Sequence, residues 1–413
     1  MRTQGWKGKA EVKMEQREKG CQWSKKCGGC SYQGMPYEKQ CRIKQRAVEE
    51  LLRGICKVKP ILAMEEPYYY RNKVHAVFDR DRKGNIIAGI YQEGTHKVIP
   101  VEGCMIEDER SSAVIATIKR LLPSFKIKVY DEDTGYGLLR HVLVRRSFAN
   151  NQLMVVLVTA SPVFPSKNNF VKALLKEHPD ITTVVQNVNG RQTSAVLGQK
   201  ENILYGKGYI EDSLCGCTFR ISSRAFYQVN PVQTEKLYKK AMELAEFKGK
   251  EMVLDAYCGV GTIGLVASRY CRQVVGVEQN PEAVKDALYN RSRNQAENVR
   301  IFQGDASKVM LDLAADGHRF DVVFMDPPRS GSTEEFITAV ADSMVKRVVY
   351  ISCNPQTLAR DLRTFEKVGY QAKDAWPVDM FPWTDAVEVV VALDRGHVAL
   401  SGESKKSMNE SIV

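Results

Sequence analysis

Long hydrophobic runs are missing from this 413-residue chain. A membrane-spanning helix needs about 20 consecutive apolar residues, and no stretch of the sequence approaches that length. The first residues also lack the apolar core of a secretory signal peptide. We therefore expect a soluble cytoplasmic protein that has no membrane partner.

Acidic residues are outnumbered, since 49 Asp and Glu stand against 60 Lys and Arg and leave a net charge of +11. Most of the excess lies in residues 1–60, where 15 basic side chains face 6 acidic ones. A basic block attracts polyanions, and nucleic acid is the simplest such partner. The predicted strands of the middle region carry further candidates for phosphate contacts, each of which also fits a solvated sheet face: Arg71, Lys73, Arg140, His141, Arg145 and Arg146.

A disulfide framework is not expected, because the count of 11 cysteines is odd and the chain has no signal peptide. Cys21, Cys27 and Cys30 lie close together around two glycines, a spacing that lets a tight loop aim several sulfurs at one centre. Three sulfurs leave one metal ligand to be found. Cys104 follows a turn and is favoured, whereas Cys41 lies on a predicted amphipathic helix and is the alternative. Four thiolates suit zinc and iron–sulfur alike.

The texture of the sequence changes along the chain. An amphipathic helix is predicted over residues 37–52, and a strand-rich region with helices at 107–122 and 166–178 runs from 70 to about 223. After Asn230, a helix-capping residue, strands and helices alternate, which indicates a parallel sheet covered by helices. Two hairpins are predicted, formed by Val74–Phe78 with Ile86–Tyr91 and by Leu138–Phe148 with Gln152–Thr159.

Ligand-binding features follow the successive strands of this C-terminal region. Gly259 and Gly261 form a turn that lets the backbone approach a ligand at a helix N-terminus. The second strand ends in Glu278, which is placed to accept hydrogen bonds from ribose hydroxyls. The third ends just before Asp305, where such folds contact an adenine amino group, and the fourth ends in Asp326 followed by two prolines. This order resembles S-adenosylmethionine-dependent methyltransferases of class I.

A thiol, that of Cys353, follows the next predicted buried strand. It limits the kinds of methyl transfer that the site could catalyse. Enzymes that methylate base amines place an aromatic residue after Asp-Pro-Pro, but Arg329 stands here. Carbon 5 of a pyrimidine is too weak a nucleophile to attack a sulfonium methyl group unless a thiolate first adds to carbon 6. Cys353 is placed for this role, and Cys258 is expected to be a small residue packed near the cofactor. Glu388, just before the last strand, is the candidate base that removes the carbon-5 proton.

Together these motifs resemble the uracil-5 RNA methyltransferase family, and are closest to its iron–sulfur members that modify large-subunit (23S) ribosomal RNA. The resemblance covers residues 21 to about 395. It rests on the cysteine spacing, on the Phe-Tyr-Gln-Val-Asn sequence that ends at Asn230, on the glycine-rich turn, on Asp326-Pro-Pro-Arg, and on Ser-Cys353-Asn. The resemblance implies the following roles: a [4Fe–4S] cluster at Cys21, Cys27, Cys30 and Cys104; cofactor and uracil sites lined by Gln228, Tyr257, Gly259, Thr262, Glu278, Asp305 and Asp326; Cys353 as nucleophile and Glu388 as base.

The expected fold class is α/β, with a Rossmann-like methyltransferase domain, a strand-rich central domain and an N-terminal iron–sulfur segment. The expected divisions are a basic tail (1–20), an iron–sulfur and RNA-binding region (21–222), the methyltransferase domain (223–396) and a polar tail (397–413). The expected function is transfer of a methyl group from S-adenosylmethionine to carbon 5 of uridine in RNA by a monomer.

Two departures from the family pattern stand out. Trp383 and Ala386 occupy positions where the family has histidines near the base, and an N-terminal OB-like RNA-binding domain is not expected before Cys21. Three rival functions remain: a tRNA uracil-5 methyltransferase, an RNA cytosine-5 methyltransferase, and a non-catalytic iron–sulfur RNA-binding or assembly factor. The cytosine-5 enzymes usually place a cysteine directly after Asp-x-Pro, and residues 326–329 contain none.

Overall fold

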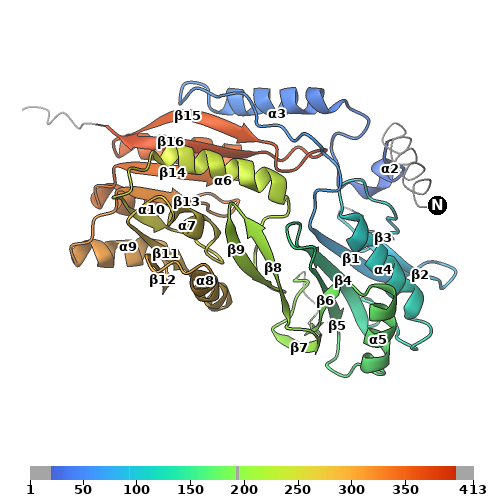
Figure 1. The fold of residues 1–413 in the computed structure, drawn as a ribbon. Coiled ribbons are helices and arrows are strands. Elements are labelled where there is room, and N and C mark those ends of the chain that lie inside the picture. The colour runs from blue at the N-terminus through green and yellow to red at the C-terminus, as the bar shows by residue number, and fades with distance from the viewer. Residues whose placement is uncertain (1–19, 93, 192–194, 397–413) are drawn as a thin grey trace, which may run out of the picture.

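The computed structural model describes residues 20–92, 94–191 and 195–396, and this part of the chain contains two seven-stranded sheets and a separate two-stranded hairpin. Each large sheet forms the centre of one half of the molecule (Figure 1). The expected basic tail, except for residue 20, and the expected polar C-terminal tail lie outside the described residues.

The N-terminal segment contacts both halves of the molecule: the Trp23 indole donates to the Glu102 carbonyl of the central half at 2.9 Å, and the longer helix that follows packs on the C-terminal half. It contains α2 (Ser24–Cys27) and α3 (Tyr37–Leu51), so the helix predicted at 37–52 is confirmed. Figure 1 shows α3 running along the edge strand β15 (Tyr370–Val378). Val48 on α3 is fully buried in the hydrophobic core of the C-terminal half. Residues 57–62 then run beside β15 and exchange backbone hydrogen bonds with it, as in Leu62 N–H to the Pro377 carbonyl at 2.8 Å.

The central half is a mainly antiparallel sheet with two helices on one face. Its strands are β1 (Lys73–Arg80), β2 (Ile86–Tyr91), β3 (Val98–Ile99), β4 (Leu139–Arg146), β5 (Leu153–Thr159), β6 (Ile181–Val188) and β7 (Lys200–Tyr205), in the order β3-β2-β1-β4-β5-β6-β7. The helices are α4 (Glu109–Leu121) and α5 (Lys167–Glu177). Both predicted hairpins and both predicted helices are confirmed. Alternate side chains of β1, β4 and β5 pack beneath the helices, as the period of a strand requires.

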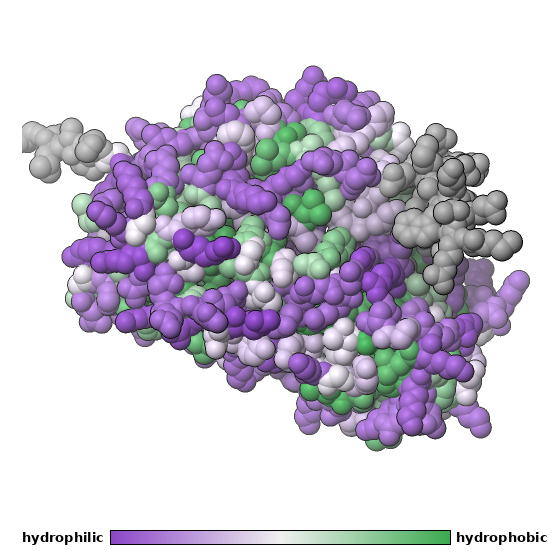
Figure 2. Space-filling model, in the orientation of Figure 1, coloured by the Kyte–Doolittle hydropathy of each residue, from purple (hydrophilic) through white to green (hydrophobic). Residues whose placement is uncertain are grey.

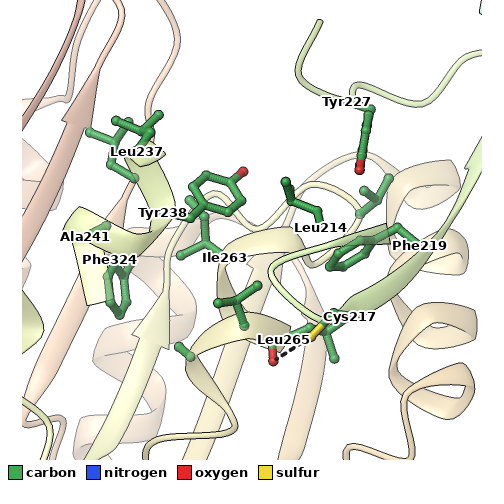
Figure 3. Close-up of a cluster of buried hydrophobic side chains, with 14 of the residues drawn as sticks. Leu214, Cys217, Phe219, Tyr227, Leu237, Tyr238, Ala241, Ile263, Leu265 and Phe324 are labelled. Atoms are coloured by element: carbon green, nitrogen blue, oxygen red, sulfur yellow. Dashed lines mark hydrogen bonds between the residues drawn. The ribbon is translucent and has the colours of Figure 1, made fainter. Parts of the chain in front are cut away.

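A hairpin that the sequence pattern did not reveal joins the two halves. It consists of β8 (Tyr209–Leu214) and β9 (Cys217–Ser222). Figure 3 shows its apolar side chains, among them Phe219, facing side chains of the C-terminal half such as Ile263. The Cys217 thiol donates to the Leu265 carbonyl at 3.7 Å. One continuous core therefore extends from the central sheet through the hairpin into the C-terminal half.

The C-terminal half is a doubly wound sheet. Its strands are β10 (Met252–Asp255), β11 (Gln273–Glu278), β12 (Val299–Gln303), β13 (Val322–Met325), β14 (Arg347–Ser352), β15 and β16 (Glu388–Arg395), in the order β12-β11-β10-β13-β14-β16-β15. Its helices are α6 (Pro231–Ala245), α7 (Thr262–Ala267), α8 (Pro281–Arg293), α9 (Ala306–Ala315), α10 (Glu334–Asp342) and α11 (Pro355–Lys367). The first five strands are parallel, and the order reverses between β10 and β13. Ligands bind outside the carboxyl ends of strands at such a reversal.

The Asn-Pro pairs explain where three of these helices begin. The side chains of Asn230, Asn280 and Asn354 each accept a hydrogen bond from a backbone N–H of the first turn. A proline occupies the next position, where its missing N–H costs nothing. The starts of α8 and α11 are thereby fixed beside the carboxyl ends of β11 and β14, and the start of α6 is fixed before the first strand of the sheet.

The face of the molecule drawn in Figure 2 is mainly hydrophilic, with apolar residues in small separate groups. Within the described ranges, no helix has both the length and the apolar character that a membrane crossing requires.

Candidate active site

Three predicted site residues lie at the ends of adjacent strands. Asp326 follows β13, Cys353 follows β14, and Glu388 begins the antiparallel strand β16. The sheet order β13-β14-β16 places these tips side by side at one edge. The negative charges of Glu388 and Asp326 both raise the pKa of the Cys353 thiol, as expected for three groups that lie close together at this edge of the sheet.

The surroundings of Glu388 raise the pKa of its carboxyl group. Burial, together with the nearby charge of Asp326, raises its pKa well above that of an ordinary glutamate, while Arg329 opposes the shift. Its Oε2 atom is buried and has no hydrogen-bond partner within the described part of the chain. A buried carboxyl group with a free oxygen can accept a proton from a ligand in the crevice.

Cys353 is only partly buried. Burial, Glu388 and Asp326 raise the pKa of its thiol to about 11, and the Arg329 guanidinium lowers it. The thiol of the ligand-free protein therefore keeps its proton at neutral pH. Any added positive charge in the crevice would shift it toward the nucleophilic thiolate.

The loop that carries Arg329 is fixed by α11. The Arg329 carbonyl accepts hydrogen bonds from the Asn354 side chain at 3.2 Å and from the Thr357 hydroxyl at 3.3 Å. Asp361 on the same helix accepts from the Tyr350 hydroxyl at 2.6 Å and from the Ser332 N–H at 2.7 Å. Sequence reasoning missed Asp361, because a lone acidic residue on a helix gives no sign of the distant loop that it binds.

The expected cofactor turn has the required shape. Gly261 has a φ of +85°, in the left-handed region that glycine tolerates best. Asp255 accepts the Gly264 N–H at 2.7 Å through Oδ2, while its Oδ1 is buried and lacks a partner among the described residues. Glu278 accepts the Gly259 N–H at 3.0 Å, which brings the tip of β11 to the turn. The partnerless Asp255 Oδ1 in the described part of the chain could accept a hydrogen bond from a nucleoside. The glycine-rich turn would let the backbone approach that nucleoside closely.

The remaining predicted cofactor residues lie in several different local environments. Thr262 opens α7 and shares a 2.9 Å hydrogen bond with the Tyr238 hydroxyl. Asp305 caps α9 through two backbone N–H groups and also accepts from Gln279 at 2.9 Å. Tyr257 packs edge-on against Phe336. Gln228 is 8% exposed, and Cys258 is buried.

The four predicted metal ligands lie together. Cys21, Cys27, Cys30 and Cys104 all line one small cavity. Cys41 lies elsewhere, on α3, with its sulfur 4.0 Å from an Asp379 oxygen. Yet no group of three or more His, Cys, Asp or Glu side chains in the described ranges is arranged to hold a metal ion. The four sulfurs thus share one cavity, but the described residues are not arranged to hold a metal ion of any kind.

The basic residues expected to touch phosphates mostly have internal partners. Arg140 binds Glu132 with three hydrogen bonds, and Arg145 donates to the Ala225 carbonyl at 3.0 Å. Both guanidinium groups are almost fully buried. They support the fold of the central half rather than forming a solvated sheet face.

Comparison with known proteins supports the same interpretation. A family model described as tRNA (uracil-5-)-methyltransferase matches residues 37–396. An uncharacterized RNA methyltransferase of Halalkalibacterium halodurans is 43% identical over 389 residues, covering 93% of this chain and 85% of the relative. One from Oceanobacillus iheyensis is 41% identical over 373 residues, covering 89% and 81%. The crystal structure of Pyrococcus abyssi tRNA (uracil-54, C5)-methyltransferase in complex with S-adenosyl-L-homocysteine superposes with a TM-score of 0.76 at 25% identity, covering 89% of this chain and 86% of that one.

The fold and these matches define an S-adenosylmethionine-dependent RNA methyltransferase of class I, which confirms the predicted α/β methyltransferase fold and the enzyme class, while the iron–sulfur segment stays a prediction. The chain belongs to the tRNA (uracil-5-)-methyltransferase family.

Proposed function

We propose that the protein methylates carbon 5 of uridine in folded RNA, with Cys353 as nucleophile and Glu388 as base. The observation that carries the proposal is the meeting of Cys353, Asp326 and Glu388 at the tips of three adjacent strands. A thiol and a buried carboxyl group in one crevice are the two groups that carbon-5 methylation requires.

The chemistry balances with these two residues. The Cys353 thiolate forms a bond to carbon 6 of the uracil, and the electron pair of the 5,6 double bond makes carbon 5 nucleophilic. S-adenosylmethionine, when bound, would supply the methyl group that carbon 5 takes, its sulfur–methyl bond breaking to leave S-adenosylhomocysteine. Glu388 then removes the carbon-5 proton, the double bond re-forms, and the Cys353–carbon 6 bond breaks. The target base must leave its stack to reach this crevice.

The cofactor and the uracil are proposed to bind at the carboxyl ends of β10, β11 and β13. The lining residues would be Gln228, Tyr257, Gly259, Thr262, Glu278, Asp305 and Asp326. The Asp255 Oδ1, which has no partner in the described part of the chain, and the hydrogen bond from Gly259 to Glu278 support a nucleoside site at this edge.

For the substrate we propose 23S ribosomal RNA, bound by a cytoplasmic monomer through the basic N-terminal region. The proposed divisions are 21–222 for RNA and metal binding and 223–396 for methyl transfer. A tRNA substrate is the second candidate, which the likeness to the Pyrococcus abyssi tRNA (uracil-54, C5)-methyltransferase favours.

Mass mapping of 23S RNA and tRNA from a deletion strain tests the proposal directly. At least one 5-methyluridine should disappear from the RNA that is the substrate and return with the wild-type gene. Complementation with Cys353→Ala should fail. Loss of 5-methylcytidine would instead indicate the cytosine-5 enzyme, and an unchanged modification profile would indicate a non-catalytic factor.

A [4Fe–4S] cluster at Cys21, Cys27, Cys30 and Cys104 is also part of the proposal, supported by their shared cavity. Thiolates from two chain segments can hold such a cluster. Anaerobically purified protein should be brown and should bleach with dithionite. Cys104→Ser should lose the colour and the matched Cys41→Ser variant should keep it, whereas a colourless protein with stoichiometric zinc would contradict the cluster.

A further inference from the structure

The loop that connects β15 to β16 is held by the cysteine-bearing N-terminal segment. This loop spans residues 379–387 and ends at Glu388. Its backbone is bound from the N-terminal side at several points: Trp383 N–H to the Gln40 side chain at 3.0 Å, Tyr32 N–H to the Trp383 carbonyl at 3.0 Å, and Tyr70 hydroxyl to the Pro382 carbonyl at 2.9 Å. The position of the loop therefore depends on residues more than 300 places away in the sequence.

Trp383 is the side chain through which the two segments meet. Its indole N–H donates to the Pro67 carbonyl at 2.6 Å, and its ring lies 5.2 Å from that of Tyr68. The residue is 7% exposed. Its φ of +72° lies in the left-handed region, which a bulky residue keeps only where its surroundings hold it.

Trp383 also belongs to the hydrophobic core against which two of the cavity cysteines pack. Trp383, Tyr70 and Ile106 form one small hydrophobic core, and Cys30 and Cys104 pack against it. A change in how the sulfurs are held must move this core, because close-packed interiors transmit displacement. From the loop that leads to Glu388, the core includes Trp383.

We propose that Trp383 is a positioning residue that couples the cysteine cavity to the base Glu388. Occupation of the cavity fixes the small core, the core fixes the loop, and the loop sets the angle at which Glu388 meets the carbon-5 proton. The inference rests on the proposed function, in which Glu388 is the base and the cysteines hold a metal cluster. It assigns the N-terminal segment a part in the last chemical step, separate from RNA binding.

The coupling predicts which step a Trp383 variant slows. In Trp383→Leu, addition of Cys353 to carbon 6 and methyl transfer to carbon 5 should proceed at the normal rate. Removal of the carbon-5 proton should be slow. Turnover should fall about tenfold to a hundredfold, the loss expected when a base is slightly misplaced. Methylated RNA–protein adduct should accumulate, and the affinity for RNA should stay unchanged. Trp383→Phe, which keeps a ring in the core, should recover part of the turnover.

Trp376→Leu is the matched control, because Trp376 lies on β15 near the same loop but stacks on Lys240 at 3.9 Å instead of facing the cavity. Its turnover and adduct level should equal those of the wild type. Equal loss of adduct formation and turnover in Trp383→Leu, or wild-type turnover in that variant, would overturn the proposal.

A spectroscopic measurement tests the coupling without catalysis. In a protein whose Trp6, Trp23 and Trp376 are replaced by Phe, only Trp383 emits. Iron removal by a chelator, or Cys104→Ser, should shift its emission to longer wavelength as the core loosens, and Cys56→Ser should leave it unchanged. If colour is lost while the emission stays fixed, the coupling is wrong although the cluster proposal stands. If the protein never contains iron, the cluster proposal fails, and the adduct measurement alone decides the role of Trp383.

Discussion

The buried ion pair between Lys44 and Asp379 should be a major support of the docked N-terminal segment. Its atoms lie 2.6 Å apart, and both side chains are fully buried. Lys44 comes from α3, and Asp379 begins the loop before Glu388. Removing the lysine leaves a buried carboxylate without its counter-charge, which typically costs about 3–5 kcal/mol.

The expected effect can be converted into a melting temperature. A folding unit of roughly 150–250 residues shifts by about 2–4 °C per kcal/mol, so Lys44→Met should lower the transition by about 6–20 °C. Far-ultraviolet circular dichroism during heating measures this shift. The double variant Lys44→Met/Asp379→Asn should recover most of it, because it has no buried charge and retains an acceptor for the Tyr37 hydroxyl, which donates to Asp379 at 2.8 Å.

Lys59→Met is the matched control. Lys59 docks on the same edge strand through a pair with Asp374 at 2.8 Å, but these side chains are 27% and 40% exposed. Such solvent-exposed pairs are worth about 0.2–1 kcal/mol. A shift for Lys44→Met no larger than that for Lys59→Met would refute the reasoning.

Three further predictions concern charge. Burial and neighbouring carboxylates raise the pKa of the Cys353 thiol to about 11, so its alkylation by iodoacetamide, followed by peptide mass mapping, should be slow at pH 7 and rise about tenfold per pH unit; a flat profile would contradict this. Burial raises the folded-state pKa of Asp255 to about 7, against about 3.9 unfolded, so its contribution to stability is complete at low pH and is lost as pH rises through 7. Asp255→Asn should remove up to about 1.4 kcal/mol per pH unit of this slope, and an unchanged slope in thermal unfolding would rule Asp255 out. Neutralising Lys7, Lys9 and Lys13, which lie outside the described residues, should flatten the dependence of RNA affinity on salt; an unchanged slope would place the phosphate contacts elsewhere.

The strands, helix starts and crevice were predictable because their signals are local. Buried β-branched runs that end in Asp326 or Cys353, and Asn-Pro pairs before helices, are readable within a few residues. The topology rule for parallel sheets then brings the tips together. Cys104, favoured over Cys41 on turn sequence alone, does line the cavity of the other three cysteines.

Features that depend on distant partners could not be predicted. The amphipathic pattern of α3 shows that one face is buried, but not that it packs on β15 or pairs Lys44 with Asp379. Likewise, Arg145 resembles a surface cation in the sequence, and its burial against the Ala225 carbonyl follows only from the fold. Asp379, an acidic residue nine places before Glu388, is likewise bound by the distant Lys44 and Tyr37.

The division of labour between Cys353 and Glu388 is the central claim, and Glu388→Gln tests it most directly. The variant is incubated with substrate RNA and S-adenosylmethionine labelled in its methyl group, and the products are separated on a denaturing gel. Because only the final proton removal is blocked, the account predicts a slow-moving RNA–protein band that carries the label and is absent from the double variant with Cys353→Ala. Normal turnover without that band would contradict the account.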